Sequence, residues 1–349
     1  MKVGLVGFAG SGKTTLFNAL TGLKADTGFG GKEAANLGMI KVPDARVDFL
    51  AEIFKPKKKT LAEIGFVDVA GPDAKKSEKG LDAKLVADMR LSDALVHVVR
   101  GFDNPALTRP PDLLRDLEEF EAEMVFSDLV QVESRLDRIR KEGKKGAEKT
   151  FFETLAAHME AGNPLRTLAL SEADLASVSG FAFLSQKPCM VLCSVADDAA
   201  GRELGDDLKA AAKKRQLTLV HMAGRAEAEI SELGPEEQAA FLADLGVTAP
   251  ARARFIAAAY AQLELISFLT TGEDECRAWT IKRGTVARRA AGKIHSDIER
   301  GFIRAEVIPF ADFKALGTEA KCREAGKLRL EGKEYVVQDG DIVHFRFNV

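Results

Sequence analysis

The most informative run of residue types lies near the amino end, at Gly7-Phe8-Ala9-Gly10-Ser11-Gly12-Lys13-Thr14. The run has the spacing G-x-x-x-x-G-K-[ST]. Glycines at these positions let the backbone wrap closely around phosphate oxygens, so that successive N–H groups point at the anion. We therefore predict that a nucleoside triphosphate, ATP or GTP, is held by the backbone of Gly10, Ser11, Gly12, Lys13, Thr14 and Thr15.

Side chains next to this loop supply a charge and two oxygen ligands. The Lys13 ammonium would stabilise charge on the β and γ phosphates, which makes it the candidate catalytic residue. Thr14 offers a hydroxyl to Mg²⁺, and Asp68 ends an apolar run where a carboxylate can hold the same metal. The Gly71 N–H follows Asp68 closely enough to reach a γ phosphate. The expected ligands of Mg²⁺ are thus Thr14 and Asp68.

Apolar runs alternating with helical patterns predict the parallel sheet that would position these residues. Buried strands are expected at residues 2–8, 62–69, 94–99, 189–195 and 217–223. Helices are expected at 14–23 and 81–90, and the glycine-rich stretch 24–39 is expected to be a loop.

Two further segments have residue patterns that differ from this alternation of strands and helices. Residues 113–141 carry apolar residues at helical spacing amid dense charge, and 149–161 predict a second helix antiparallel to the first. A lysine-rich turn over 143–146 would join the two arms, and its lysines could dock on RNA or be a solvated turn. From about residue 271, short strands surround one predicted helix at 286–299.

The carboxyl-terminal stretch also contains a turn signal. Asp339-Gly340-Asp341 lies between two apolar runs, a pattern typical of a β-hairpin.

Composition limits the remaining possibilities. The chain has 349 residues, enough for two or three domains, and its net charge of -3 excludes a broadly polybasic protein. Four cysteines without a C-x-x-C pair and five histidines without H-E-x-x-H argue against disulfides and structural zinc. No apolar run reaches the roughly 18 residues of a membrane span. We expect a cytoplasmic monomer with no membrane contact.

Several segments resemble the YchF subfamily of Obg-like P-loop NTPases. They are Asp68-Val69-Ala70-Gly71, residues 93–100, 278–282 and 299–306, and above all the tail from Glu324 to Val349. The similarity covers nearly the whole chain. It implies an α/β fold: a Ras-like P-loop domain (1–110 and 165–268), an inserted helical coiled-coil arm (111–164) and a C-terminal β-grasp, ubiquitin-like TGS domain (269–349).

The resemblance further implies ATP in preference to GTP, slow hydrolysis and contact with ribosomes, or RNA, through the TGS domain and the arm. Three positions depart from the family. Gly10 stands where the family's P-loop has an asparagine, and Lys32 lies near the position of the switch threonine that closes over Mg²⁺. Pro72 occupies a position where this family has an apolar residue and Ras-like enzymes have glutamine. No water-positioning side chain is therefore evident.

Base recognition is expected at the ends of the later strands. The family's N-x-x-E becomes Ser194-Val195-Ala196-Asp197, and Ala223 would line the pocket opposite. Asp197 could accept two hydrogen bonds from guanine, whereas the family's preference points to adenine, and Ser194 is too short to replace asparagine. The candidate base-binding residues are Ser194, Val195, Asp197 and Ala223, with the base left open.

The sequence therefore predicts a Mg²⁺-dependent nucleoside triphosphatase with slow turnover, whose nucleotide state serves a translational partner. The alternative is a nucleotide-binding scaffold for RNA or ribosome that has lost hydrolysis. A third interpretation, an RNA-binding protein with a vestigial P-loop, would require undetectable nucleotide affinity.

Overall fold

The computed structural model describes residues 2–25, 36–69, 81–143, 146–247 and 249–348. The chain divides into two compact units. The first comprises Met1–Gly38 and Gly65–Ala259, and the second comprises Met39–Ile64 and Tyr260–Val349. The chain thus passes into the second unit within one strand and returns within another, although the sequence analysis placed residues 39–64 in the nucleotide domain.

The elements up to residue 262 alternate strands and helices in the manner expected of an α/β protein. In the first half of the chain they are β1 (Lys2–Val6), α1 (Lys13–Thr21), β2 (Asn36–Val42), α2 (Ala45–Phe54), β3 (Lys58–Thr60), β4 (Ala62–Asp68), α3 (Ala83–Arg90), β5 (Ala94–Gly101), α4 (Leu113–Lys141), α5 (Ala147–Glu160) and the 3₁₀ turn η2 (Leu165–Thr167). They continue with α6 (Glu172–Val178), η3 (Ser179–Phe181), β6 (Cys189–Val195), η4 (Asp197–Ala199), α7 (Asp206–Lys214), β7 (Thr218–Met222), α8 (Gly224–Glu232), α9 (Pro235–Asp244) and α10 (Ala251–Gln262).

The first sheet has the strand order β2-β4-β1-β5-β6-β7. Strand β1 lies between β4 and β5 and is parallel to both, with Val3 beside Phe66 and Ala94. Strands β5, β6 and β7 continue the parallel arrangement. Because parallel strands end at the same edge, the residues after β1, β4, β5, β6 and β7 meet there.

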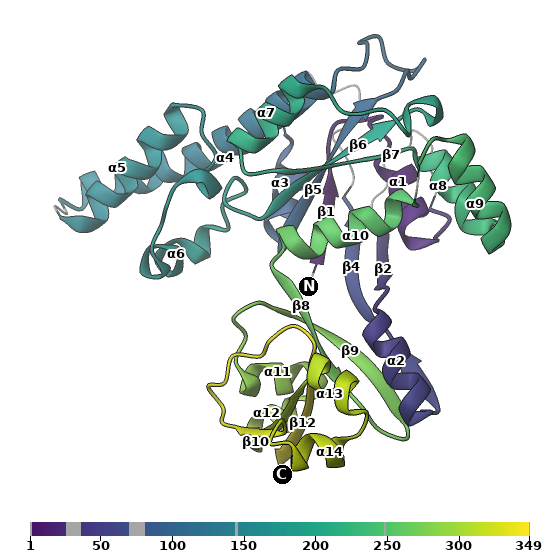
Figure 1. The fold of residues 1–349 in the computed structure, drawn as a ribbon. Helices are drawn as coiled ribbons and strands as arrows, with labels where there is room; N and C mark the ends of the chain where they lie inside the picture. Colours follow the sequence, from purple (N-terminus) through teal and green to yellow (C-terminus); the bar gives the residue numbers. More distant parts are fainter. Residues whose placement is uncertain (1, 26–35, 70–80, 144–145, 248, 349) are drawn as a thin grey trace. The chain divides into compact units, whose positions relative to one another are not determined.

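Helices cover both faces of this sheet (Figure 1). One apolar cluster joins Val67 of β4 to α3, the first half of α4 and α7, with Phe120 of α4 stacked on His97 of β5. Phe66, the neighbour of Val67, points to the other face and meets Phe255 of α10 at a ring-centroid distance of 5.5 Å. Alternation of side chains along β4 therefore builds two cores.

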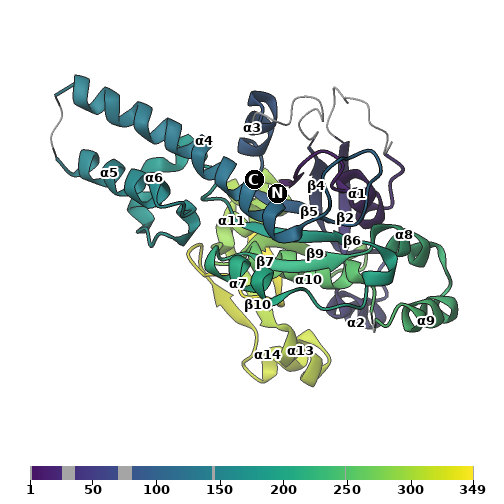
Figure 2. The ribbon, with the colours of Figure 1, turned by 90° about the horizontal axis from the view of Figure 1, so that it is seen from above.

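Helices α4 and α5 form an arm that extends from the sheet (Figures 1 and 2). Asp112 caps α4 by accepting a hydrogen bond from the Arg115 N–H. Along the arm, α4 and α5 pack through a second apolar cluster that contains Leu136, Ile139 and Phe152. The 29-residue length of α4 matches the predicted helix, because apolar residues recur every three or four positions up to Ile139.

The second unit contains a six-stranded sheet in the order β11-β10-β12-β8-β9-β3. Its remaining elements are β8 (Leu265–Thr270), β9 (Glu275–Lys282), α11 (Ala287–Ile294), α12 (Ser296–Arg300), β10 (Phe302–Pro309), α13 (Phe310–Leu316), α14 (Glu319–Glu324), β11 (Arg329–Glu331) and β12 (Asp341–Phe347). Helix α11 packs its alanines into the core against Phe268 and Phe345. Helix α2 joins this unit, since Phe49 and Phe54 contact Phe310 and Phe313.

Three expectations about local structure are wrong. The predicted loop 24–39 includes the start of strand β2 at Asn36. The single predicted helix 286–299 is two helices, because His295 adopts an extended backbone and its Nδ1 accepts the Asp297 N–H as the cap of α12. The turn at Asp339-Gly340 opens no hairpin, because β12 pairs with β10 and β8 instead.

Among the helices in the described part of the chain, none combines the length and apolar character that crossing a membrane requires.

Candidate nucleotide-binding site

The carboxyl edge of the first sheet brings most of the predicted site residues together. Asp68 of β4 lies beside Leu5 of β1, and Leu5 comes two residues before Gly7 of the loop. Ser194 is the last residue but one of β6 and lies next to Arg100 of β5, and Ala223 directly follows β7. The strand order therefore places the phosphate loop between the metal-ligand candidate and the base-pocket candidates.

The loop between β1 and α1 has the shape that its glycines predict. Gly10 and Gly12 have φ of 72° and 95°, the left-handed region that glycine adopts without strain. A Cβ on Gly12 would lie 2.6 Å from the Ser194 Oγ, and one on Gly7 would lie 2.4 Å from the Val98 carbonyl oxygen. Close approach to the neighbouring strands therefore requires glycine at positions 7 and 12.

Backbone amides at the start of α1 are available to an anion. Leu16 N–H donates to the Gly12 carbonyl at 2.9 Å, so the amides of Lys13, Thr14 and Thr15 precede the first intrahelical bond. The Ser11 N–H differs, because it donates to the Phe8 carbonyl at 3.3 Å and so closes the loop itself.

Lys13 is almost fully buried, and its ammonium lies inside the loop. Its Nζ donates to the Gly7 and Phe8 carbonyls at 3.0 and 2.8 Å. Burial lowers the pKa of Lys13 to about 8, against the opposing effect of the Asp68 carboxylate. Since an ammonium carries three donors, one remains for a ligand oxygen. An anion in the loop would also compensate the buried charge.

Thr14 and Asp68 fit a magnesium ion. The Thr14 hydroxyl donates to Asp68 Oδ2 at 2.9 Å. Two oxygens bound at neighbouring octahedral positions of Mg²⁺, each about 2.1 Å from the metal, lie about 3.0 Å apart, close to the separation observed here. Magnesium usually takes only one or two protein ligands and completes its shell with phosphates and water. No group of three or more histidine, cysteine, aspartate or glutamate residues in the described part of the chain forms a self-sufficient metal site.

The structure adds residues that the sequence analysis missed. Asn36 Nδ2 donates to Asp68 Oδ2 at 3.4 Å, so the start of β2 reaches the metal-ligand pair. Asn104 Nδ2 donates to the Gly10 carbonyl at 3.4 Å, and Leu107 stands next to the same glycine. Asn104 follows β5 in an Asp-Asn-Pro turn. Its place after a parallel strand was the available signal, because ligands bind at that edge.

The four base-pocket candidates occupy neighbouring strand ends. Ser194 is buried, whereas the Asp197 carboxylate is exposed and accepts the Ala226 N–H at 3.3 Å. Val195 packs against a small apolar cluster that contains Ala223. Because a carboxylate accepts several hydrogen bonds, Asp197 retains capacity for a base. Gly224 packs the base-pocket candidates closely against α1, since a Cβ added to Gly224 would lie 3.2 Å from the Thr15 methyl group.

Three positions of the predicted site, Lys32, Gly71 and Pro72, lie outside the described residues.

Comparisons with known proteins agree with this geometry. A family model described as 50S ribosome-binding GTPase matches residues 2–132. A second, described as a protein of unknown function (DUF933) and labelled for the C-terminal part of YchF GTPases, matches residues 265–348. The chain is 40% identical over 367 residues to the ribosome-binding ATPase YchF of Haemophilus influenzae, covering 100% of this chain and 99% of that protein. The chain belongs to the YchF family.

Other YchF relatives extend over the same length. The ribosome-binding ATPase YchF of Bacillus subtilis is 37% identical over 372 residues and covers all of both chains. The solved structure of the Schizosaccharomyces pombe YchF GTPase superposes with a TM-score of 0.86 at 30% identity, covering 99% of this chain and 97% of that one. The expected YchF resemblance and the α/β P-loop fold are confirmed.

Proposed function

We propose that this chain binds a nucleoside triphosphate together with Mg²⁺, hydrolyses it slowly, and acts as a nucleotide-switched factor that associates with ribosomes in the cytoplasm. The observation that carries the proposal is the contact between Thr14 and Asp68 beside the buried Lys13 ammonium. The bacterial YchF relatives are named ribosome-binding ATPases, which supports the same activity and partner.

The residues of the loop would divide the work between them. Amides at the start of α1 hold phosphate oxygens, and the remaining Lys13 donor stabilises charge on the transferred phosphoryl group. Thr14 and Asp68 would hold Mg²⁺, which neutralises charge on the β and γ oxygens when bound. Pro72 offers no polar side chain to orient water. Turnover is therefore expected to be slow until a partner completes the site.

A phosphate-release assay with and without purified ribosomes tests the enzymatic part. We expect Lys13→Ala to lower turnover by about 100-fold or more, because transition-state charge loses its cation. Lys24→Ala, which changes an exposed lysine of the same region, is the matched control and should stay within about twofold of the original chain. Tight nucleotide binding with no turnover, even with ribosomes present, would instead establish the scaffold function.

Calorimetric titration with ATP and GTP, each with Mg²⁺, addresses the base. A tenfold preference corresponds to about 1.4 kcal/mol. Asp197→Ala should reduce that preference if its carboxylate contacts the base, whereas equal loss for both nucleotides would assign Asp197 a structural role. We further propose that the chain acts as a monomer and meets the ribosome through the arm and the C-terminal TGS domain. Light scattering and ribosome co-sedimentation check these two points.

A further inference from the structure

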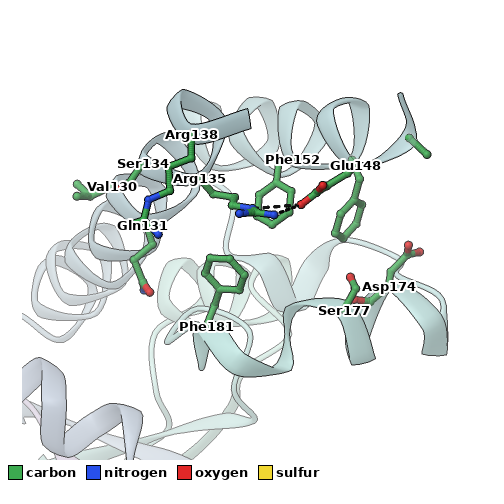
Figure 3. Close-up of a pocket in the computed structure, with 12 residues that line it drawn as sticks. Val130, Gln131, Ser134, Arg135, Arg138, Glu148, Phe152, Asp174, Ser177 and Phe181 are labelled. Atoms are coloured by element: carbon green, nitrogen blue, oxygen red, sulfur yellow. Dashed lines mark hydrogen bonds and ion pairs between the residues drawn. The ribbon is translucent and has the colours of Figure 1, made fainter. Parts of the chain in front are cut away.

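A pocket of about 850 Å³ lies on the arm, away from the phosphate loop. Its walls come from α4, α5, α6 and η3, and we call it the arm groove. Figure 3 shows Arg135 and Glu148 on one side of the space and Asp174 and Ser177 of α6 on the other.

The half-buried rings of Phe151 and Phe181 line the arm groove, and the almost fully buried Phe152 lies between them and the core. The Phe152 ring meets Phe151 at a centroid distance of 5.7 Å and Phe181 at 5.5 Å. Phe181 in turn stacks on Phe183 at 5.1 Å, which ties the surface to the buried core of the arm. A concave aromatic surface on rigid helices is the usual receptor for a bulky apolar side chain.

The apolar character of the groove continues along α4, from the lining residue Val130 to Phe126 one turn beyond the pocket. Phe126 and Val130 of α4 are 64% and 49% exposed, and they lie four residues apart on one face of the helix. Ser134 and Arg138 follow at the same spacing and line the pocket. Exposed large apolar residues that lead into a groove indicate a protein-binding surface.

The charges favour a protein over a nucleic acid. Glu148 and Asp174 place two carboxylates on the wall, which would repel phosphate groups. Arg135 is already paired with Glu148. Arg138, by contrast, has no ion-pair partner among the side chains that the structure describes. Asp174 likewise has no ion-pair partner among the described side chains and accepts hydrogen bonds from Ser171 alone within that part of the chain. The groove therefore offers apolar contacts, one unpaired cation and one carboxylate, a combination suited to an apolar peptide segment whose own carboxylate meets Arg138.

We propose that the arm groove binds a segment of a ribosomal protein, with a bulky apolar side chain between Phe151 and Phe181 and a carboxylate paired with Arg138. This inference rests on the proposed ribosome association and specifies which class of ribosomal component the arm contacts.

Affinity for purified ribosomes, measured with the full chain, provides the first test. Val130→Glu and Arg138→Glu should each weaken binding about tenfold or more. Leu91→Glu, at a 70% exposed apolar position outside the groove, and Arg140→Glu, two residues beyond Arg138, are the matched controls and should stay within about twofold. Circular dichroism melts confirm that all four variants fold.

Photo-crosslinking identifies the occupant. With Ser134 replaced by p-benzoylphenylalanine, irradiation of the ribosome complex should attach the arm to a ribosomal protein. Crosslinks to ribosomal RNA alone would overturn the inference, as would groove variants that bind like the original chain. If the original chain itself fails to bind ribosomes, the proposed association and the inference both fail. If the original chain binds and the groove variants bind equally well, only the inference is overturned.

Discussion

The buried carboxylate of Asp128, at the root of the arm, and the buried polar groups around the phosphate loop differ in whether their hydrogen-bonding capacity is satisfied. At the root, Asp128 is fully buried, and its two oxygens accept the Leu184 and Ser185 N–H groups at 2.9 and 2.7 Å. Beneath the loop, the Ser11 hydroxyl and both ring nitrogens of His97 are buried without a hydrogen-bond partner among the described residues. His97 lies beside Val6, one residue before Gly7.

The paired Asp128 carboxylate stabilises the fold, whereas the unpaired groups around the phosphate loop lie where a ligand is expected to bind. Paired buried groups fix geometry, and Asp128 ties α4 to the chain that leads into β6. Unpaired buried groups cost stability and are uncommon in folded proteins, where they often mark functional sites. The buried Lys13 ammonium lies in the same region. The loss of folding stability that such buried groups cause is therefore concentrated around the phosphate loop.

The largest expected effect on stability is at the root of the arm. Asp128→Ala leaves two buried N–H groups without an acceptor and removes the ion pair with Arg90, whose nitrogen lies 3.4 Å from the carboxylate. We expect the free energy of unfolding to fall by about 3 kcal/mol, measured by urea denaturation.

Asp137→Ala is the matched control on the same helix. Its carboxylate is largely exposed and pairs with Arg140, so its removal should change the free energy of unfolding by less than about 1 kcal/mol. Equal losses at positions 128 and 137 would remove the basis of the comparison.

His97 supplies a pH-dependent test of the opposite region. Burial, with the nearby charges of Lys13 and Arg166, lowers the pKa of His97 to about 3 from 6.5. Between pH 3 and pH 6.5 the His97 imidazole is protonated in the unfolded chain and neutral in the folded chain. His97 therefore makes the free energy of unfolding decrease as the pH falls below about 6.5. Between pH 7.5 and 5.5 the loss amounts to about 1.4 kcal/mol.

His97→Leu should remove this part of the acid sensitivity. The measurement is the difference in unfolding free energy between variant and original chain at the two pH values. His344→Leu, at an exposed position, controls for the loss of a histidine as such. A difference that does not change with pH would show that His97 finds a partner in solution.

The smallest expected effect is a gain in stability. Ser11→Ala removes an unpaired buried hydroxyl but keeps the backbone, so the free energy of unfolding should rise by about 1 kcal/mol while nucleotide affinity stays within about twofold. Ser92→Ala is the matched contrast, because that buried hydroxyl donates to the Asp88 carbonyl at 3.3 Å and its loss should destabilise. Thermal melts of both variants decide the sign.

Local patterns were sufficient to predict much of the fold. The boundaries of α4 at Leu113 and Lys141 and of β6 at Cys189 and Val195 agree with the sequence analysis, because helical periodicity and short apolar runs are read within one element. The phosphate loop was recognisable for the same reason. Strand β2 was missed because glycines precede it, and its pairing depends on residues far along the chain.

The chemistry at each position is already readable in the sequence: the glycines that permit a close loop, the lysine inside it, and a threonine and an aspartate that can share a metal. Tertiary structure alone decided which distant groups meet these residues. The contacts of Asn36 and Asn104 with the site, the burial of His97 without a partner among the described residues and the aromatic groove of the arm all depend on packing between segments far apart in the sequence. Such contacts follow from the order of strands and helices, which no local pattern encodes.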